Sequence, residues 1–171
     1  MHAEADGIGK AAVKARVWQH PMQPAVESNA RGKLVFQLKS QPWHDPSTLY
    51  PIEILEENMV EILAEAAQVL VLRGTDEALM EPADDYHDLA DENSTGAWNE
   101  LVLLRRGMLT PNRVLMPKTV EILSKIPEVA SNTFGKVTLA FMEPGAVVKR
   151  HTSGTNLRIR IHCGLVVPEV L

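Results

Sequence analysis

Cysteine is almost absent from this sequence of 171 residues, and aromatic residues make up only 5% of it. The single cysteine, Cys163, excludes an intramolecular disulfide. It falls on the apolar side of an alternating stretch, where a thiol behaves as a small hydrophobic group. Because no Cys–His catalytic pattern surrounds it, we expect a buried structural thiol and not a nucleophile.

Positive charge is also in deficit. Lys and Arg number 17 against 22 Asp and Glu, which gives a formal net charge of −5. Binding to nucleic acid depends on clustered Lys and Arg, so this balance argues against a nucleic-acid partner. There is no apolar run long enough for a secretory signal or a transmembrane helix. We therefore expect no membrane segment and, by default, a cytoplasmic protein.

The sequence divides into a short leading segment and one domain. Residues 1–32 are rich in Ala, Gly, Pro and polar residues and show no apolar period, so we predict a disordered or loosely attached segment. Residues 33–171 carry the regular patterns, and the hydrophobic content of 45% is ordinary for a globular chain with a core.

Two helices are predicted in this domain. Residues 51–72 carry apolar residues at three- and four-residue spacing, which is typical of one buried helix face. Residues 117–126 repeat the pattern over a shorter span that ends at Pro127. The stretch 75–96 between them is acidic and irregular. Its carboxylates do not match the spacing of an EF-hand loop, so we favour a solvated loop over a calcium site.

Four stretches are predicted strands because they alternate or concentrate β-branched and apolar residues: 33–38, 98–109, 136–142 and 157–167. We expect Gly107 to end the second strand or to form a bulge in it. Glu143-Pro144-Gly145 has the composition of a tight turn after the third. The order of elements predicts an α+β fold with helices packed on one side of a mainly antiparallel sheet.

The last predicted strand has two chemically different faces. Ile161 and Cys163 lie on its apolar side, whereas Arg160 and His162 lie on the other. Guanidinium groups bind carboxylates bidentately, so the second face suits an anion. His151, shortly before the strand, has the chemistry of a metal ligand. The same alternation is also typical of a sheet with one solvated face, and the pattern alone favours that interpretation.

The order of residues around this strand changes the balance. The C-terminal third contains Pro144-Gly145, His151, Asn156, Arg158, Arg160, His162, Gly164-Leu165 and Pro168. In this order they resemble the aspartyl/asparaginyl β-hydroxylase family, whose members are iron(II)- and 2-oxoglutarate-dependent oxygenases. Weaker similarities upstream extend the resemblance back to Lys33.

The resemblance implies a fold, two cofactors and roles for particular residues. The fold is a double-stranded β-helix, a jelly-roll or cupin-like barrel, and the cofactors are iron(II) and 2-oxoglutarate. His151 matches the first iron ligand, and Arg160 and His162 match the residues that meet the 2-oxoglutarate carboxylate beside the metal. Asn156 matches a residue that shapes the loop. Ser153 stands where many related oxygenases have a carboxylate ligand, although this family often has glycine there.

The resemblance also implies residues that lie beyond Leu171 in the family, namely a second iron-binding histidine and an arginine for the far carboxylate of 2-oxoglutarate. We therefore expect residues 33–171 to be a C-terminally truncated oxygenase domain that binds both cofactors weakly and does not turn over alone. The complete family member hydroxylates the β-carbon of Asp or Asn in a peptide or protein. The alternative is a non-catalytic pseudoenzyme or interaction module. An open strand edge favours self-association.

Overall fold

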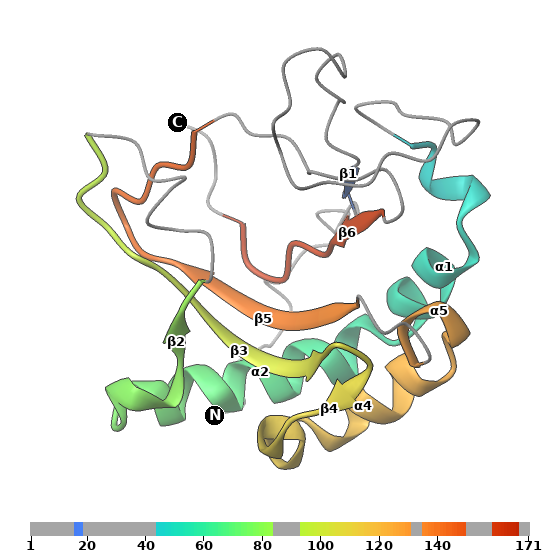
Figure 1. Ribbon diagram of the computed structural model, residues 1–171, viewed down its shortest axis with the longest axis horizontal. Helices are drawn as coiled ribbons and strands as arrows, with labels where there is room; N and C mark the ends of the chain where they lie inside the picture. Colours follow the sequence, from blue (N-terminus) through green and yellow to red (C-terminus); the bar gives the residue numbers. More distant parts are fainter. Residues whose placement is uncertain (1–15, 19–43, 84–92, 131–134, 150–158, 168–171) are drawn as a thin grey trace, which may run out of the picture. The chain divides into compact units, whose positions relative to one another are not determined.

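The computed structural model describes residues 16–18, 44–83, 93–130, 135–149 and 159–167 (Figure 1). The chain divides into two compact units. One unit consists of Met1–Glu57 together with Thr152–Leu171, and the other of Asn58–His151. Among the described residues no helix combines the length and the apolar character that crossing a membrane would need.

The unit Asn58–His151 contains a four-stranded antiparallel sheet built on β3 (Trp98–Arg105). β5 (Lys136–Met142) pairs with β3 along most of its length, as the sequence predicts for 136–142. β2 (Glu81–Pro82) and β4 (Met108–Leu109) also pair with β3. The β3 residues that they pair with are also paired with β5. Since a strand has only two edges, β2 and β4 share the edge opposite β5.

The predicted strand 98–109 is a hairpin and not one continuous strand. β3 ends at Arg105 and β4 begins at Met108, and these two residues face each other in the ladder. The two connecting residues both have positive φ, 55° at Arg106 and 75° at Gly107. A two-residue loop of this kind matches the twist of the strands that it joins. Gly107 therefore ends the strand, as predicted, but by reversing the chain.

β3 is irregular in its middle, where the register with β5 shifts between Val102 and Leu104. Such a bulge leaves backbone groups outside the ladder and increases the local twist. Polar groups that follow β4 bond to these carbonyls. The backbone amide of Thr110 donates to Leu103 O at 3.0 Å, and Asn112 Nδ2 donates to Val102 O at 3.1 Å. The bulge is thus satisfied by residues close in sequence.

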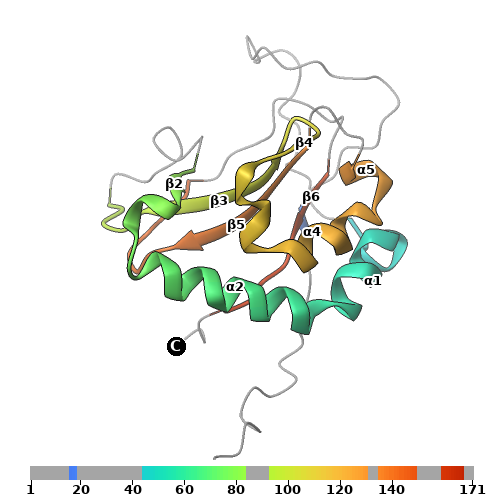
Figure 2. The same cartoon turned by 90° about the horizontal axis from the view of Figure 1, so that it is seen from below.

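Two helices, α2 (Met59–Arg73) and α4 (Pro117–Ser124), lie side by side along one face of this sheet (Figure 2). The short α5 (Pro127–Ala130) follows α4, and the 3-10 turns η2 (Glu77–Leu79) and η3 (Pro111–Leu115) complete the described connections. The buried apolar side chains come from helices, sheet and connections alike: Ile62, Ala66, Val69, Met80, Ala83, Leu101, Val102, Leu103, Leu104, Met116, Ile122 and Ile126. Burial of β3 on both faces makes it the centre of this core.

Both predicted helices differ from the structure at a boundary. The predicted helix 51–72 is interrupted at Asn58, which separates α1 (Tyr50–Glu57) from α2. Asn competes with the helical backbone for hydrogen bonds, and Asn58 has a non-helical φ of −109°. The predicted helix 117–126 begins at Pro117 as expected, but α4 ends at Ser124, two residues before the predicted end. Pro127 begins α5, because proline is well suited to a first helical position.

The other unit, Met1–Glu57 with Thr152–Leu171, holds four described elements. These are β1 (Arg16–Trp18), the 3-10 turn η1 (Pro46–Thr48), α1 and β6 (Arg160–His162). β6 pairs antiparallel with β1. Ile52 of α1 is buried, and Leu49, Ile161 and Cys163 pack against it. This small cluster is the described core of the unit.

Two strand predictions differ from the structure of this unit. The predicted strand 157–167 is too long, since among its described residues only 160–162 are in a ladder and the chain bends at 165–166 after Gly164. β1 lies within residues 1–32, where the sequence indicates no regular element, because three residues are too few to show a period. The predicted strand 33–38 lies outside the described residues.

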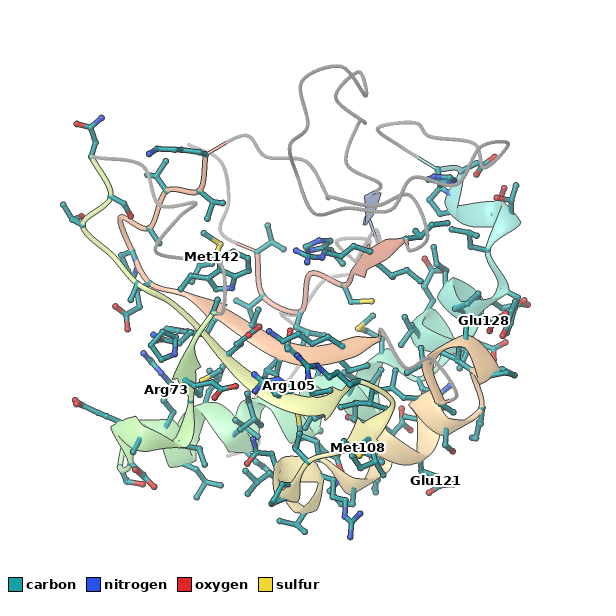
Figure 3. The ribbon with its side chains drawn as sticks, in the orientation of Figure 1. Arg73, Arg105, Met108, Glu121, Glu128 and Met142 are labelled. Atoms are coloured by element: carbon teal, nitrogen blue, oxygen red, sulfur yellow. The ribbon has the colours of Figure 1, made fainter. Side chains whose placement is uncertain are left out.

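The predicted class is confirmed at the level of helices packed on a mainly antiparallel sheet, because every described strand pair is antiparallel. The prediction that the acidic stretch 75–96 is an irregular loop is wrong at residues 77–79 and 81–82. It contains η2 and β2, and Asp76 begins η2 by accepting a hydrogen bond from Ala78 N at 3.0 Å. Arg105, which is labelled in Figure 3, pairs at 2.5 Å with Glu81 of β2.

Candidate functional site

Arg160 and His162 lie on one face of β6, as the alternation predicts. Both are exposed, whereas Ile161 between them is half-buried and packs against Ile52. Cys163 follows on the apolar side. Residues two apart on a strand have Cα atoms ~7 Å apart, so a guanidinium and an imidazole project side by side from the exposed face. The structure thus brings two of the three predicted site residues together.

β6 has a backbone partner that the sequence did not predict. Its pairing with β1 sets Trp18 opposite Arg160 and Arg16 opposite His162. A ladder of this kind fixes the φ and ψ angles of β6 and therefore the side from which alternate residues project. The neighbouring cationic and imidazole groups are held by backbone pairing as well as by the contact of Ile161 with Ile52.

The third predicted site residue, His151, lies outside the described residues, as do Ser153 and Asn156. Within the part of the chain that the structure describes, no three His, Cys, Asp or Glu residues are grouped so that they could hold a metal ion. The predicted iron ligand therefore rests on the sequence motif. What the structure does describe is the turn that leads toward it.

That turn connects β5 to the segment that carries His151. Ala146 N donates to Glu143 O at 3.0 Å, with Pro144 and Gly145 between them. Gly145 has a φ of +82°, so the turn is of type II and requires the glycine. The predicted turn at Glu143-Pro144-Gly145 is confirmed. Lys149 is the last described residue before His151.

A second segment, residues 94–97, holds this turn in place from the other side. Thr95 N donates to Gly145 O at 3.0 Å, and Val147 N donates to Ser94 Oγ at 3.0 Å. The approach is close, because a Cβ added at Gly96 would lie 2.4 Å from the backbone oxygen of Pro144. Only glycine fits there without moving backbone.

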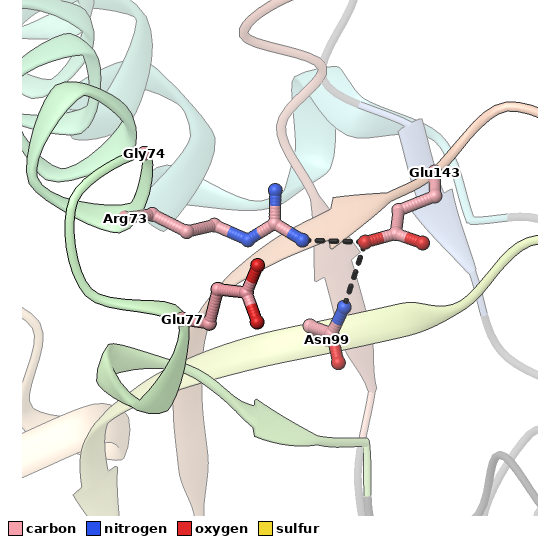
Figure 4. A pocket seen from close by; sticks show the side chains of 5 residues that line it. All are labelled: Arg73, Gly74, Glu77, Asn99 and Glu143. Atoms are coloured by element: carbon pink, nitrogen blue, oxygen red, sulfur yellow. Dashed lines mark hydrogen bonds and ion pairs between the residues drawn. The ribbon is translucent and has the colours of Figure 1, made fainter.

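The side-chain carboxylate of Glu143 accepts hydrogen bonds from three polar groups. Arg73 Nη2, at the end of α2, donates to its Oε1 at 2.5 Å, and Asn99 Nδ2 donates to the same oxygen at 3.4 Å (Figure 4). The backbone amide of Ala97 donates to Oε2 at 3.3 Å. The Arg73 guanidinium also lies 4.3 Å from the ring centre of Phe141. Figure 4 shows the Arg73 and Asn99 groups directed at one carboxylate oxygen.

Arg73, Asn99 and Glu143 line a polar recess of about 470 Å³ together with Gly74 and Glu77. The sequence did not reveal this cluster, because Arg73, Asn99 and Glu143 are far apart in the chain. Each is a polar residue near the end of a helix or strand, which is common and indicates no partner. The one signal in the sequence is the acidic residue directly before Pro144-Gly145. Polar and acidic residues are common at the start of a turn, so Glu143 by its position alone does not indicate Arg73 as its ion-pair partner.

Another histidine among the described residues is His44, which precedes Asp45. An isolated His–Asp pair in a loop bounded by prolines lacks the further ligands of a metal site, so the sequence argues against a metal pair there. The Asp45 carboxylate accepts hydrogen bonds from Ser47 N at 3.0 Å and Ser47 Oγ at 2.8 Å. These bonds lower the pKa of Asp45 below its usual value. Asp45 therefore caps η1, which is a structural role. His2, His20 and His87 lie outside the described residues.

Cys163 is half-buried and not fully buried as predicted, but its surroundings are those of a structural thiol. Burial, followed by the nearby negative charge of Glu56, raises the pKa of the thiol from 9.0 to about 11. A nucleophilic cysteine needs the opposite shift. The thiol packs with Ile161 against Ile52 and contributes to the core that supports β6.

Comparison with known proteins identifies relatives of this chain. Residues 56–170 match the family model described as aspartyl/asparaginyl beta-hydroxylase. The human and mouse aspartyl/asparaginyl beta-hydroxylases are each 32% identical over 161 residues, which cover 91% of this chain and 19% of those proteins. The aspartate beta-hydroxylase domain-containing protein 2 of Xenopus tropicalis is 27% identical over 121 residues, which cover 70% of this chain and 31% of that protein. The chain thus spans about a fifth of the length of the first two relatives.

Proposed function

Because this chain belongs to the aspartyl/asparaginyl β-hydroxylase family, we propose that it carries the cosubstrate-binding strand of an iron(II)- and 2-oxoglutarate-dependent hydroxylase. The proposed reaction is hydroxylation of an Asp or Asn side chain in a peptide or protein. When bound, the metal and 2-oxoglutarate supply the oxidising power, and the protein supplies binding and orientation. The observation that carries the proposal is the shared exposed face of Arg160 and His162.

The chemistry of this face fits a carboxylate of 2-oxoglutarate. The guanidinium of Arg160 offers a planar fork of hydrogen-bond donors that matches a carboxylate. His162, on the same exposed face of β6, offers a second hydrogen-bonding group in a neutral or cationic form. Backbone pairing with β1 fixes the strand positions from which both groups project, and a charge-assisted hydrogen bond is stronger than a neutral one.

The metal part of the proposal rests on His151 and on the family. A neutral imidazole is a suitable ligand for iron(II), and Ser153 offers a hydroxyl two residues later. Both residues lie outside the described part of the chain, so their proposed roles follow from their places in the motif. The jelly-roll barrel is likewise a proposal, supported by the antiparallel pairing of all described strands. We also propose that an open edge of the sheet permits self-association.

The cosubstrate proposal is tested by calorimetric titration of 2-oxoglutarate in the presence of Mn(II), which replaces the oxidisable iron. Arg160→Met should weaken the affinity by roughly ten- to hundredfold, the effect of losing a hydrogen bond to a charged group. His162→Phe should weaken it less. Arg113→Met, which removes an exposed arginine from η3, is the matched control and should leave the affinity unchanged. Equal affinity of the wild type and Arg160→Met would refute the proposed role of β6.

The hydroxylation itself is tested by mass spectrometry of peptides that contain Asp or Asn, incubated with iron(II), ascorbate and 2-oxoglutarate. We expect no gain from this chain alone. For the chain extended with the later strands of a family member, the proposal predicts a gain of one oxygen atom that depends on 2-oxoglutarate and is lost in His151→Ala. A gain that persists in His151→Ala would come from another enzyme. Binding of 2-oxoglutarate by the extended chain without any gain would instead support the alternative of a non-catalytic interaction module.

A further inference from the structure

We infer that Arg73 and Glu143 are positioning residues, whose ion pair sets the direction in which the chain leaves β5 toward His151. The inference rests on the proposed function in that His151 is taken as the metal ligand. It goes beyond the family assignment, because neither residue belongs to the motif that carries the resemblance. Both residues, and the turn between β5 and His151, lie in the unit Asn58–His151.

The Arg73 guanidinium makes two favourable contacts, one with a carboxylate and one with an aromatic ring. The Arg73 guanidinium is held between the Glu143 carboxylate at 2.5 Å and the ring of Phe141, whose centre is 4.3 Å away. Contact with an aromatic face restricts a guanidinium that would otherwise move freely in solvent. The two side chains retain only 25% and 35% exposure, so the pair is screened less than one on an open surface.

Glu143 makes hydrogen bonds through its backbone and through its side chain. Its backbone amide donates to Ala97 O at 2.9 Å, one step beyond the end of β5, and its carbonyl closes the type II turn. Its side chain binds α2 and the 94–97 segment at the same time. The residue is therefore tied through amide, carbonyl and carboxylate, and the chain that continues from it reaches His151 eight residues later.

An ordinary stabilising ion pair would give a different pattern of effects. If the pair acts only on global stability, its loss should speed hydrogen exchange throughout the core. If it fixes the turn, its loss should act on the turn amides of Thr95, Ala146 and Val147, whose bonds join the turn internally and to the 94–97 segment. Local opening is measured by amide exchange without any metal, so this test does not depend on activity.

The experiment compares two ion pairs of the same chemistry within one unit. Arg73→Met, Arg73→Lys, Glu143→Gln and Arg73→Met/Glu143→Gln are the test variants. Arg105→Met and Glu81→Gln remove the pair between β3 and β2, which has the same 2.5 Å separation and does not touch the turn. Hydrogen exchange of the turn amides, thermal unfolding and Mn(II) affinity are measured for every variant.

We expect Arg73→Met and Glu143→Gln to speed exchange of the turn amides by about two- to fivefold, as for a partly exposed ion pair. Mn(II) affinity should fall by a similar factor. Arg73→Lys should retain most of the protection, and the double variant should equal the single ones because the two residues act through each other. The control variants should leave the turn amides unchanged. Unchanged turn amides in Arg73→Met, or equal acceleration in the controls, would overturn the inference.

Variants of His151 separate this inference from the proposed function. If His151→Ala binds Mn(II) as tightly as the wild type, His151 is not the metal ligand, and the proposed function fails whatever the turn does. If His151→Ala weakens Mn(II) binding but Glu143→Gln does not, the function stands and the positioning role is wrong. In the His151→Ala background, Glu143→Gln should change Mn(II) affinity no further.

Discussion

Glu65 of α2 caps the first turn of α4 through Thr119. Its Oε2 accepts hydrogen bonds from both the backbone amide and the hydroxyl of Thr119, each at 2.8 Å, and Oε1 accepts from Lys118 N at 2.9 Å. Glu65 is 7% exposed. The amides at the start of a helix have no hydrogen-bond partner within the helix. The buried carboxylate of a neighbouring helix accepts their hydrogen bonds, and its negative charge interacts favourably with the helix dipole.

Removal of this carboxylate should therefore destabilise the protein. Glu65→Ala leaves the amides of Lys118 and Thr119 and the hydroxyl of the buried Thr119 without this acceptor, and we expect a loss of roughly 2–3 kcal/mol in the free energy of unfolding. Glu65→Gln keeps one acceptor and should cost about half as much. Glu61→Ala, an exposed glutamate on the same helix, is the control and should change stability by less than about 0.5 kcal/mol. Urea denaturation measures all three, and equal effects at positions 61 and 65 would contradict the cap.

The hairpin between β3 and β4 should tolerate, and benefit from, a better turn residue. Arg106 adopts a φ of 55°, which is unfavourable for a side chain of its kind, and the next residue is Gly107. Asn-Gly is the preferred pair for this loop, so Arg106→Asn should raise the free energy of unfolding by about 0.5–1 kcal/mol. Arg106→Val should lower it, since β-branched residues disfavour positive φ. Thermal melts in which Arg106→Val is the more stable variant would contradict the observed turn.

Cys163 should react slowly with alkylating reagents in the folded protein. Its pKa of about 11 lies above 9.0, so at pH 8 the thiolate fraction is roughly a hundredfold smaller than for an ordinary thiol. Iodoacetamide labelling followed by mass spectrometry should be slow in buffer and fast in urea. Glu56→Gln should speed the native reaction slightly, because the second cause of the shift is the charge of Glu56. Equal rates in buffer and urea would show that the thiol is not buried.

The same shift fixes the sign of a pH effect on stability. The folded-state pKa is raised, so the contribution of Cys163 to stability is complete below the unfolded value near 9 and is lost as the pH rises toward 11. Denaturation at pH 8 and pH 10.5 should show this loss in the wild type. The loss of unfolding free energy between the two pH values should be smaller in Cys163→Ala. An identical pH dependence in both proteins would contradict the contribution of Cys163.

Local patterns in the sequence predicted those parts of the structure that depend on neighbouring residues. The alternation of Val137, Leu139 and Phe141 indicated β5 with its correct bounds, and the Pro144-Gly145 pair indicated the turn. The positions of Arg160 and His162 on one face followed from the same two-residue period. Each of these features is decided by side-chain direction or by φ preference within a few residues.

Features that depend on contacts between distant residues were not predicted. The partner of β6 is β1, more than a hundred residues earlier in the chain, and no local period marks it. The Arg73–Glu143 ion pair joins residues 70 positions apart, and the Glu65 cap joins residues 54 positions apart. The break at Asn58 was missed because apolar residues continue at helical spacing across it. Such choices are made by tertiary packing, which overrides weak local preference.

One measurement tests the central claim most directly, namely that His151 and Arg160 hold the metal and 2-oxoglutarate together. Bound Mn(II) speeds the magnetic relaxation of protons close to it, so the relaxation rate of the 2-oxoglutarate protons reports whether both ligands occupy one site. The rate is measured with Mn(II) for the wild type, His151→Ala, Arg160→Met and the control Arg113→Met, and for a mixture without protein. We predict a protein-dependent enhancement in the wild type and in Arg113→Met that falls to the protein-free value in His151→Ala and in Arg160→Met. The same enhancement in all four proteins would contradict the account.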